Sequence, residues 1–157
     1  MSFAVVPPAP QSPANTAVSA GAFWPSVDCN QARDALRLAD IVTHERLLAE
    51  LHGAMITVTG ELRGWRALRE ADGFATLAAV DPTDLIDDQT RGEVLFIRAV
   101  RFHAAACLAE LHRGIGSTNE AITRGDTEAI TAADYRRLAT HAIRDILGET
   151  RTVVELI

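Results

Sequence analysis

The residues of this chain that could bind a metal ion are scattered, and only one pair has a useful spacing. His103 and Cys107 lie four positions apart, so a helix would place both on one face, with Glu110 nearby. A structural zinc site needs four ligands, and no second clustered pair of His or Cys residues supplies the rest. His44-Glu45 starts like a zinc-protease helix, but Leu48 stands where the second histidine belongs. We therefore predict no metal ion and no cofactor, and we expect Cys107 to be an ordinary core residue.

The sequence also lacks the short motifs of common enzymes. It has no nucleophile elbow, no phosphate-binding glycine loop ending in Lys-Ser or Lys-Thr, and no glycine fingerprint of dinucleotide-binding folds. Acidic residues are numerous, but on helix surfaces they are more often solvated than paired for acid–base chemistry. We predict that the protein is not an enzyme and has no catalytic residues. A small metal-dependent enzyme built on His103 and Cys107 ranks last among the alternatives.

Composition limits the size and the class of the protein. At 157 residues the chain can bury one core and is too short for two full-sized domains. All fifteen basic residues are arginines scattered along the chain, and the formal net charge is −6, so the chain would repel DNA. Cys29 and Cys107 lie far apart, which favours a reducing cytosol. The sequence contains no basic leader and no apolar run of eighteen residues, so we expect a soluble protein without a membrane segment.

Four segments carry the apolar spacing, caps or glycine stops of amphipathic helices, namely residues 28–39, 43–71, 91–113 and 132–147. The second would form a helix about 43 Å long, which predicts a spine along which the other segments pack. Its apolar stripe consists of Leu47, Leu51, Met55, Val58, Leu62 and Trp65. We therefore predict an all-α fold, a four-helix bundle with one long spine helix. Leu62 and Leu108 belong to its expected core.

Three glycines interrupt the spine. Gly53, Gly60 and Gly64 each lower helix stability by about 1 kcal/mol relative to alanine, so they suggest the close approach of another backbone. The four-residue spacing of Gly60 and Gly64 is typical of tightly packed helices, although its strong meaning belongs to membrane proteins. We expect another helix or a symmetry-related copy to pack there.

The two ends of the chain differ from the helical domain, which we assign to residues 23–148. Residues 1–22 are rich in proline and predict an extended arm, either disordered or lying on a neighbouring molecule. Phe23 and Trp24 follow, and they either staple the chain onto its core or anchor a partner. Residues 149–157 form a predicted docking tail of β-type sequence with no partner strand in the chain. The alternative is a tail that folds back onto its own bundle.

Two connections are longer than the usual loops of helix bundles. Residues 74–90 are acidic, with Asp81, Asp84, Asp87 and Asp88, and we expect this loop to serve a function or to face a partner. Residues 114–130 contain three glycines and several polar residues, which predict a mobile loop.

A succession of short stretches, in order from residue 23 to residue 157, resembles the head-completion proteins of contractile-tailed temperate bacteriophages. These stretches are Phe23-Trp24-Pro25-Ser26-Val27-Asp28, Arg37-Leu38, Val58-Thr59-Gly60-Glu61-Leu62 with Trp65, Asp72-Gly73-Phe74-Ala75-Thr76-Leu77, Arg98-Ala99-Val100, Arg144-Asp145-Ile146-Leu147-Gly148 and Val153-Val154-Glu155-Leu156-Ile157. No single stretch is specific, but their order and spacing together favour the resemblance.

The resemblance implies a head-to-tail adaptor of the virion that docks beneath the portal protein after DNA packaging. It implies a ring of twelve subunits that offers a platform for a neck, head-closure or tail-terminator protein, while packaged DNA passes through without specific binding. Such a protein is made in the cytoplasm of the host bacterium. The expected partner-binding residues are Phe23, Trp24, Arg151, Val153, Val154, Leu156 and Ile157. A stand-alone helical binding or regulatory module is the second interpretation, because the same helices and loops would suit it.

Overall fold

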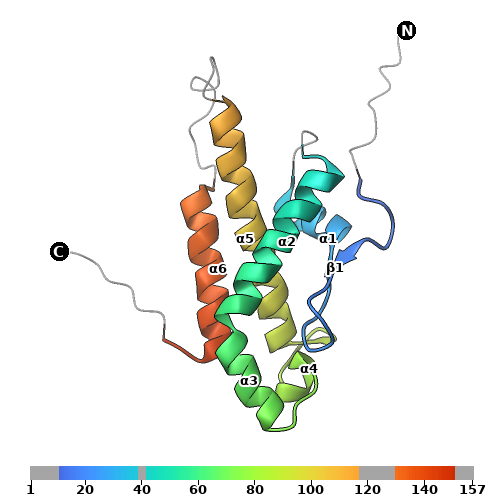
Figure 1. Cartoon of the computed structure of the whole chain (residues 1–157), viewed down its shortest axis with the longest axis vertical. Coiled ribbons are helices and arrows are strands. Elements are labelled where there is room, and N and C mark those ends of the chain that lie inside the picture. The colour runs from blue at the N-terminus through green and yellow to red at the C-terminus, as the bar shows by residue number, and fades with distance from the viewer. Residues whose placement is uncertain (1–10, 39–41, 117–129, 151–157) are drawn as a thin grey trace, which may run out of the picture.

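The structure, a computed structural model, describes residues 11–38, 42–116 and 130–150 (Figure 1). Within them the chain is mostly helical, which confirms the predicted class in its main feature. The helices are α1 (Cys29–Leu36), α2 (His44–Glu61), α3 (Arg63–Ala71), α4 (Leu77–Val80), α5 (Arg91–Gly116) and α6 (Ala132–Leu147). Two short antiparallel strand pairs accompany them, β1 (Ala17–Val18) with β2 (Val27–Asp28) and β3 (Leu85–Ile86) with β4 (Gln89–Thr90).

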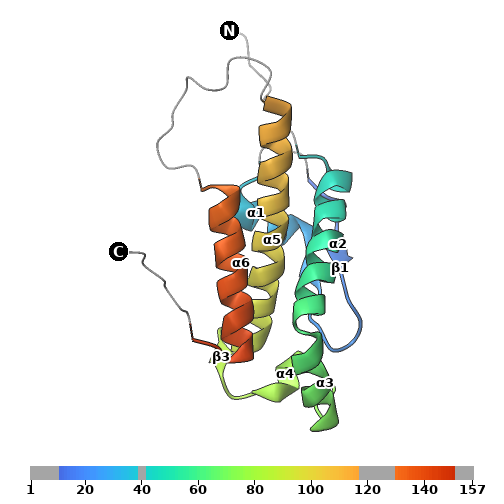
Figure 2. The ribbon, with the colours of Figure 1, turned by 60° about the vertical axis from the view of Figure 1, so that its left-hand side comes forward.

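The long helix α5 lies at the centre of the arrangement. It packs against α6 on one side and against α2 on the other, and the short helix α1 also contacts it (Figures 1 and 2). The described residues therefore do not confirm the predicted four-helix bundle with one long spine helix. The central position of α5 follows from its composition, because Phe96, Ala99, Val100 and Ala104 are fully buried.

The predicted spine helix over residues 43–71 is wrong as a single element, because α2 ends before Leu62 and α3 begins after it. Leu62 has a φ of −87° and a ψ of 1°, outside helical geometry. Its amide still donates to the Val58 carbonyl at 3.1 Å, so the chain bends without losing that hydrogen bond. The hydroxyl of Thr59 donates to the Met55 carbonyl at 2.7 Å, and such contacts favour helix bending. The neighbouring glycines, Gly60 and Gly64, further lower the cost of the bend.

The expected close approach at the spine glycines is also wrong within the described part of this chain. A Cβ atom added at Gly53, Gly60 or Gly64 would meet no heavy atom within 4 Å. No intrachain packing therefore requires a glycine at these positions. Contact with a second copy stays a prediction.

The ends of α6 agree with the sequence. Thr131 and Asp134 form a capping box, in which the Thr131 hydroxyl accepts from the Asp134 amide and the Asp134 carboxylate accepts from the Thr131 amide. Gly148 ends the helix with a φ of 73°, a left-handed conformation that favours glycine. Leu62 and Leu108 are buried in the core, as predicted.

Part of the predicted N-terminal arm lies on its own chain. The Ser12 amide donates to Asn30 Oδ1 at 2.9 Å, and Asn30 Nδ2 donates to the Ser12 carbonyl at 3.0 Å. Val18 in β1 pairs with Val27 in β2, and both side chains are buried. Ser12 and Val18 of the predicted arm therefore contact the helical domain of the same chain. Residues 1–10 lie outside the described residues.

Candidate functional site

The C-terminal residues predicted to bind a partner lie outside the described residues. These are Arg151, Val153, Val154, Leu156 and Ile157. The structure does fix where this segment starts, because the Glu149 amide donates to the Arg144 carbonyl at 2.9 Å after the turn at Gly148. The end of α6 lies beside the β3–β4 hairpin (Figure 2). The segment therefore leaves the fold next to that hairpin.

Phe23 and Trp24 are packed inside this chain. The Trp24 ring stacks on Phe96 of α5 with a centroid distance of 4.6 Å, and Phe23 meets Trp24 edge-on at 4.8 Å. The Phe23 carbonyl accepts from the Leu77 amide at 2.8 Å, which links the N-terminal segment to α4. Both side chains are buried, in agreement with the staple interpretation. Direct contact of these rings with a partner stays a prediction.

The acidic connection over residues 74–90 is more ordered than the sequence suggested. It contains helix α4, capped by the Thr76 hydroxyl, and the two-residue β3–β4 hairpin. Asp87 at the hairpin turn has a φ of 51°, which Asp tolerates better than most residues. The sequence signal for this hairpin was an apolar pair followed by Asp-Asp and a β-branched residue. The many acidic residues of this connection favoured the interpretation as a loop, so the hairpin was not predicted.

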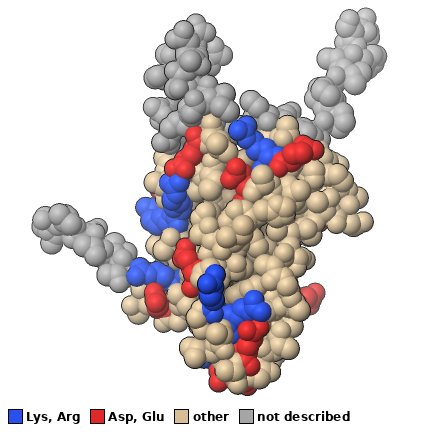
Figure 3. All heavy atoms as spheres, viewed as in Figure 1, with Lys and Arg blue, Asp and Glu red and all other residues tan. Residues whose placement is uncertain are grey.

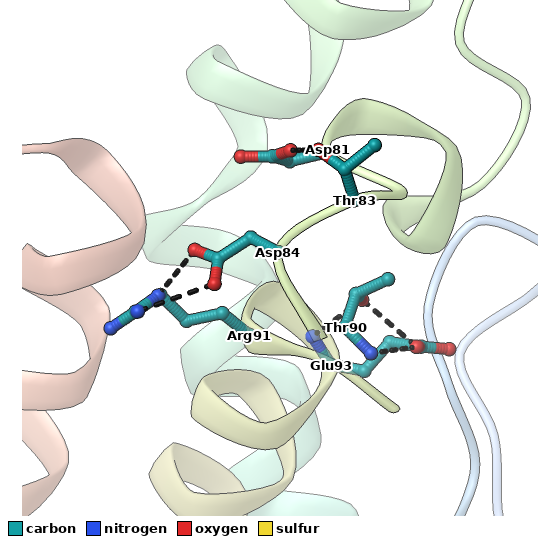
Figure 4. Close-up of polar contacts among 6 residues, drawn as sticks. All are labelled: Asp81, Thr83, Asp84, Thr90, Arg91 and Glu93. Carbon is teal, nitrogen blue, oxygen red and sulfur yellow. Dashed lines mark hydrogen bonds and ion pairs between the residues drawn. The ribbon is translucent and has the colours of Figure 1, made fainter. Parts of the chain in front are cut away.

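An ion pair closes the base of the hairpin onto α5. The guanidinium of Arg91 donates to both carboxylate oxygens of Asp84, with an Nη2–Oδ1 distance of 3.2 Å (Figure 4). The Arg91 amide also donates to the Asp84 carbonyl at 2.8 Å. Hydrogen bonding by Arg91 lowers the pKa of Asp84 below its ordinary value. Asp84 is therefore a structural residue of this connection and is charged at neutral pH.

A second polar contact fixes the other end of the hairpin. The Glu93 carboxylate accepts from the Thr90 amide at 3.0 Å and from the Thr90 hydroxyl at 2.9 Å (Figure 4). This is the arrangement of a capping box at the start of α5. Both ends of the hairpin are therefore attached to the start of α5. Its tip presents Leu85, Ile86, Asp87 and Asp88 to the surface.

The His103 and Cys107 pair does not extend to a metal site within the described residues. Cys107 Sγ lies 3.9 Å from His103 Nδ1, and no group of three His, Cys, Asp or Glu residues in the described part of the chain could hold a metal ion. Burial raises the pKa of the Cys107 thiol, which favours the neutral form. Glu110 forms an ion pair with Arg136 and so joins α5 to α6. Cys107 is only partly buried, whereas the sequence predicted an ordinary core residue.

Two further observations describe the surface. On the face shown in Figure 3, acidic and basic side chains lie intermixed, so this face is not uniformly acidic. A search of the described helices for a stretch both apolar and long enough to cross a bilayer finds none. A ring through which DNA passes without specific binding stays a prediction, because no second copy is present.

Comparison with known proteins gives two matches and one negative result. Residues 18–157 match the family model described as phage head completion protein (GPL). The head completion/stabilization protein of Escherichia phage P2 is 30% identical over 135 residues, covering 86% of this chain and 79% of the relative. No solved structure matches the chain. The matched range includes every described helix.

Proposed function

This chain belongs to the family of phage head completion proteins, and from that premise we propose that it acts as the adaptor between the head and the tail of a tailed phage. Its role is structural and it is not an enzyme. The observation that carries the proposal is the family match over residues 18–157, which spans the whole helical domain. The protein is then a component of the virion, made in the cytoplasm of the host bacterium. We place it at the junction of head and tail.

In this function the chain docks beneath the portal protein as a ring, with twelve subunits to match the portal. Closed rings are built from one repeated contact between two different faces of the subunit, which a compact helical domain can provide. The net charge of −6 supports a bore that does not retain packaged DNA. The ring offers its other face to a neck, head-closure or tail-terminator protein.

We propose that the C-terminal segment is the anchor to the portal. Val153, Val154, Leu156 and Ile157 favour a strand, and addition of this strand to a sheet of the portal satisfies both its backbone groups and its side chains. The fixed start of the segment at Gly148 supports this role, because a rigid base limits the directions that the segment can take. Arg151 adds a contact if the portal surface is acidic, with more effect on the encounter rate than on affinity.

The β3–β4 hairpin is the candidate contact for the next component or for the bore. Its tip is exposed, and it is fixed to α5 by Arg91 and Glu93. An exposed, rigid tip that combines apolar and acidic residues suits recognition of another protein.

The experiment uses the full chain and its purified portal protein. Electron microscopy of the mixture is expected to show a ring of added density below the portal. A chain truncated after Thr150 is expected to keep its helicity and thermal unfolding but to lose docking. If the truncated chain docks as tightly as the full chain, the segment is not the anchor. If the full chain does not bind the portal at all, the adaptor function is wrong.

A further inference from the structure

The apolar C-terminal segment would favour aggregation in a subunit that has not yet bound its partner. Residues 153–157 contain three β-branched residues and one leucine, with Glu155 as the single charged residue. Segments of this kind pair with other chains when they are exposed. A subunit that must wait for its portal therefore benefits from a site on its own surface that covers the segment.

The described surface contains a groove at the place where this segment leaves the fold. Its volume is about 270 Å³, and it lies between the hairpin, α5 and α6. The apolar part of its lining consists of Ile86, Val94, Leu95, Leu138 and Ala142. Asp145, three residues before the turn at Gly148, lines the same groove. The groove thus starts within one helical turn of the end of α6.

The charged residues around the groove follow an order that is complementary to Arg151 and Glu155 of the segment. Asp145 lines the end nearest to Gly148 together with Arg91, whose charge is paired with Asp84, and the hairpin beside it carries the exposed Asp87 and Asp88. His141 also lines the groove. Further along α5 comes Arg98, whose guanidinium lies 5.2 Å from the Phe102 ring centroid. Arg98 has no ion pair with any carboxylate of the described residues, whereas six other described arginines have one. An acidic end and a basic end are therefore separated by an apolar stretch.

We propose that residues 151–157 of the free subunit occupy this groove of the same molecule. Arg151 then lies at the acidic end, Glu155 faces Arg98, and Val154 and Leu156 cover the apolar lining. The spacing agrees, because four residues of extended chain from Arg151 to Glu155 span about 13 Å. The groove follows α5 from Arg91 to Arg98, which is about 11 Å along a helix.

The contact between residues 151–157 and the groove is weak enough to be reversible. Arg98 is exposed, and exposed ion pairs stabilise weakly, so a partner with a longer sheet edge can displace the segment. The inference adds a resting site for the segment that the proposed function assigns to the portal. Its tests use the isolated chain, so their outcome does not depend on portal docking.

The first test measures how fast trypsin cleaves after Arg151 in the native protein. Arg98→Glu is expected to accelerate release of residues 152–157 about three- to fivefold, the range of a lost exposed ion pair. Leu138→Glu is expected to accelerate it more, because it places a charge on the apolar lining. The double variant Arg98→Glu with Glu155→Arg is expected to restore the slow rate. Arg63→Glu, at an exposed arginine outside the groove, serves as the matched control. Equal cleavage rates in all variants would overturn the proposal.

The second test identifies which molecule supplies the segment. In a Leu138→Cys, Val154→Cys double variant, mild oxidation is expected to give a disulfide within one monomer. The control pair combines Val154→Cys with Ala49→Cys, on the exposed face of α2, and is expected to remain reduced. Cys29 is buried, and Cys107, which is only partly buried, is replaced by alanine in both pairs. Disulfides formed only between two molecules, or equally in both pairs, would show that the segment does not occupy its own groove.

Discussion

Replacing Gly53 by alanine is expected to stabilise the protein. Gly53 lies in the middle of α2 and is exposed to solvent, and a Cβ atom there would meet no heavy atom within 4 Å. The substitution therefore removes the helix penalty of glycine without creating a clash, a gain of about 0.5–1 kcal/mol in the free energy of unfolding. For a domain of this size, such a gain raises the melting temperature by about 1–4 °C.

The matched control is the same substitution at Gly148. There φ is 73°, which costs a non-glycine residue about 1–2 kcal/mol, so Gly148→Ala is expected to lower the melting temperature. Circular dichroism during heating and urea unfolding of both variants would measure the two effects. If Gly53→Ala were neutral or destabilising, the reasoning that α2 is a regular, uncovered helix at this position would be refuted. A Gly53→Ala variant that is more stable but does not assemble would show that a partner backbone approaches there.

Three further outcomes follow from the contacts described above. Leu62→Ala and Leu108→Ala are each expected to lower the free energy of unfolding by about 2–5 kcal/mol in urea titrations, because both side chains are buried. A loss below about 1 kcal/mol at Leu62 would contradict its core position. Arg91 lowers the pKa of Asp84 in the folded state, so the ion pair stabilises the fold at neutral pH, and this stabilisation is lost as the pH falls through that pKa. Arg91→Gln is therefore expected to make the free energy of unfolding less dependent on pH between about pH 5 and pH 2. Cys29 and Cys107 are expected to react slowly with iodoacetamide in the native state and quickly in urea, since burial raises both pKa values; fast native reaction would contradict their packing.

The sequence predicted the elements whose signals are local. Helix α6 begins and ends as expected because Thr131, Asp134 and Gly148 act through their own backbone geometry. The bend at Leu62 was not predictable from the apolar stripe, because Leu62 stays in the stripe and remains buried while its dihedral angles change. The bend depends on the balance between Thr59, the flanking glycines and packing against α5.

The candidate site was predictable only in part. The aromatic pair Phe23 and Trp24 was recognisable as a staple because large aromatic residues before a helix start seek a core. The β3–β4 hairpin was not recognised, since its strands are only two residues long and its stability comes from Asp84, Arg91 and Glu93. The groove between the hairpin, α5 and α6 depends on tertiary packing, which no local pattern encodes.

The position of α5 has a consequence for how the subunit loses its structure. Helices α1, α2, α4 and α6 and both strands of the hairpin contact α5, so none of them can detach without exposing part of this helix to water. Opening of one element therefore weakens the support of the others, which is the condition for cooperative unfolding. The subunit then has few partly open states in which its apolar helix faces are available to the wrong neighbour. In a crowded assembly pathway, that cooperativity protects the fold until the correct partner arrives.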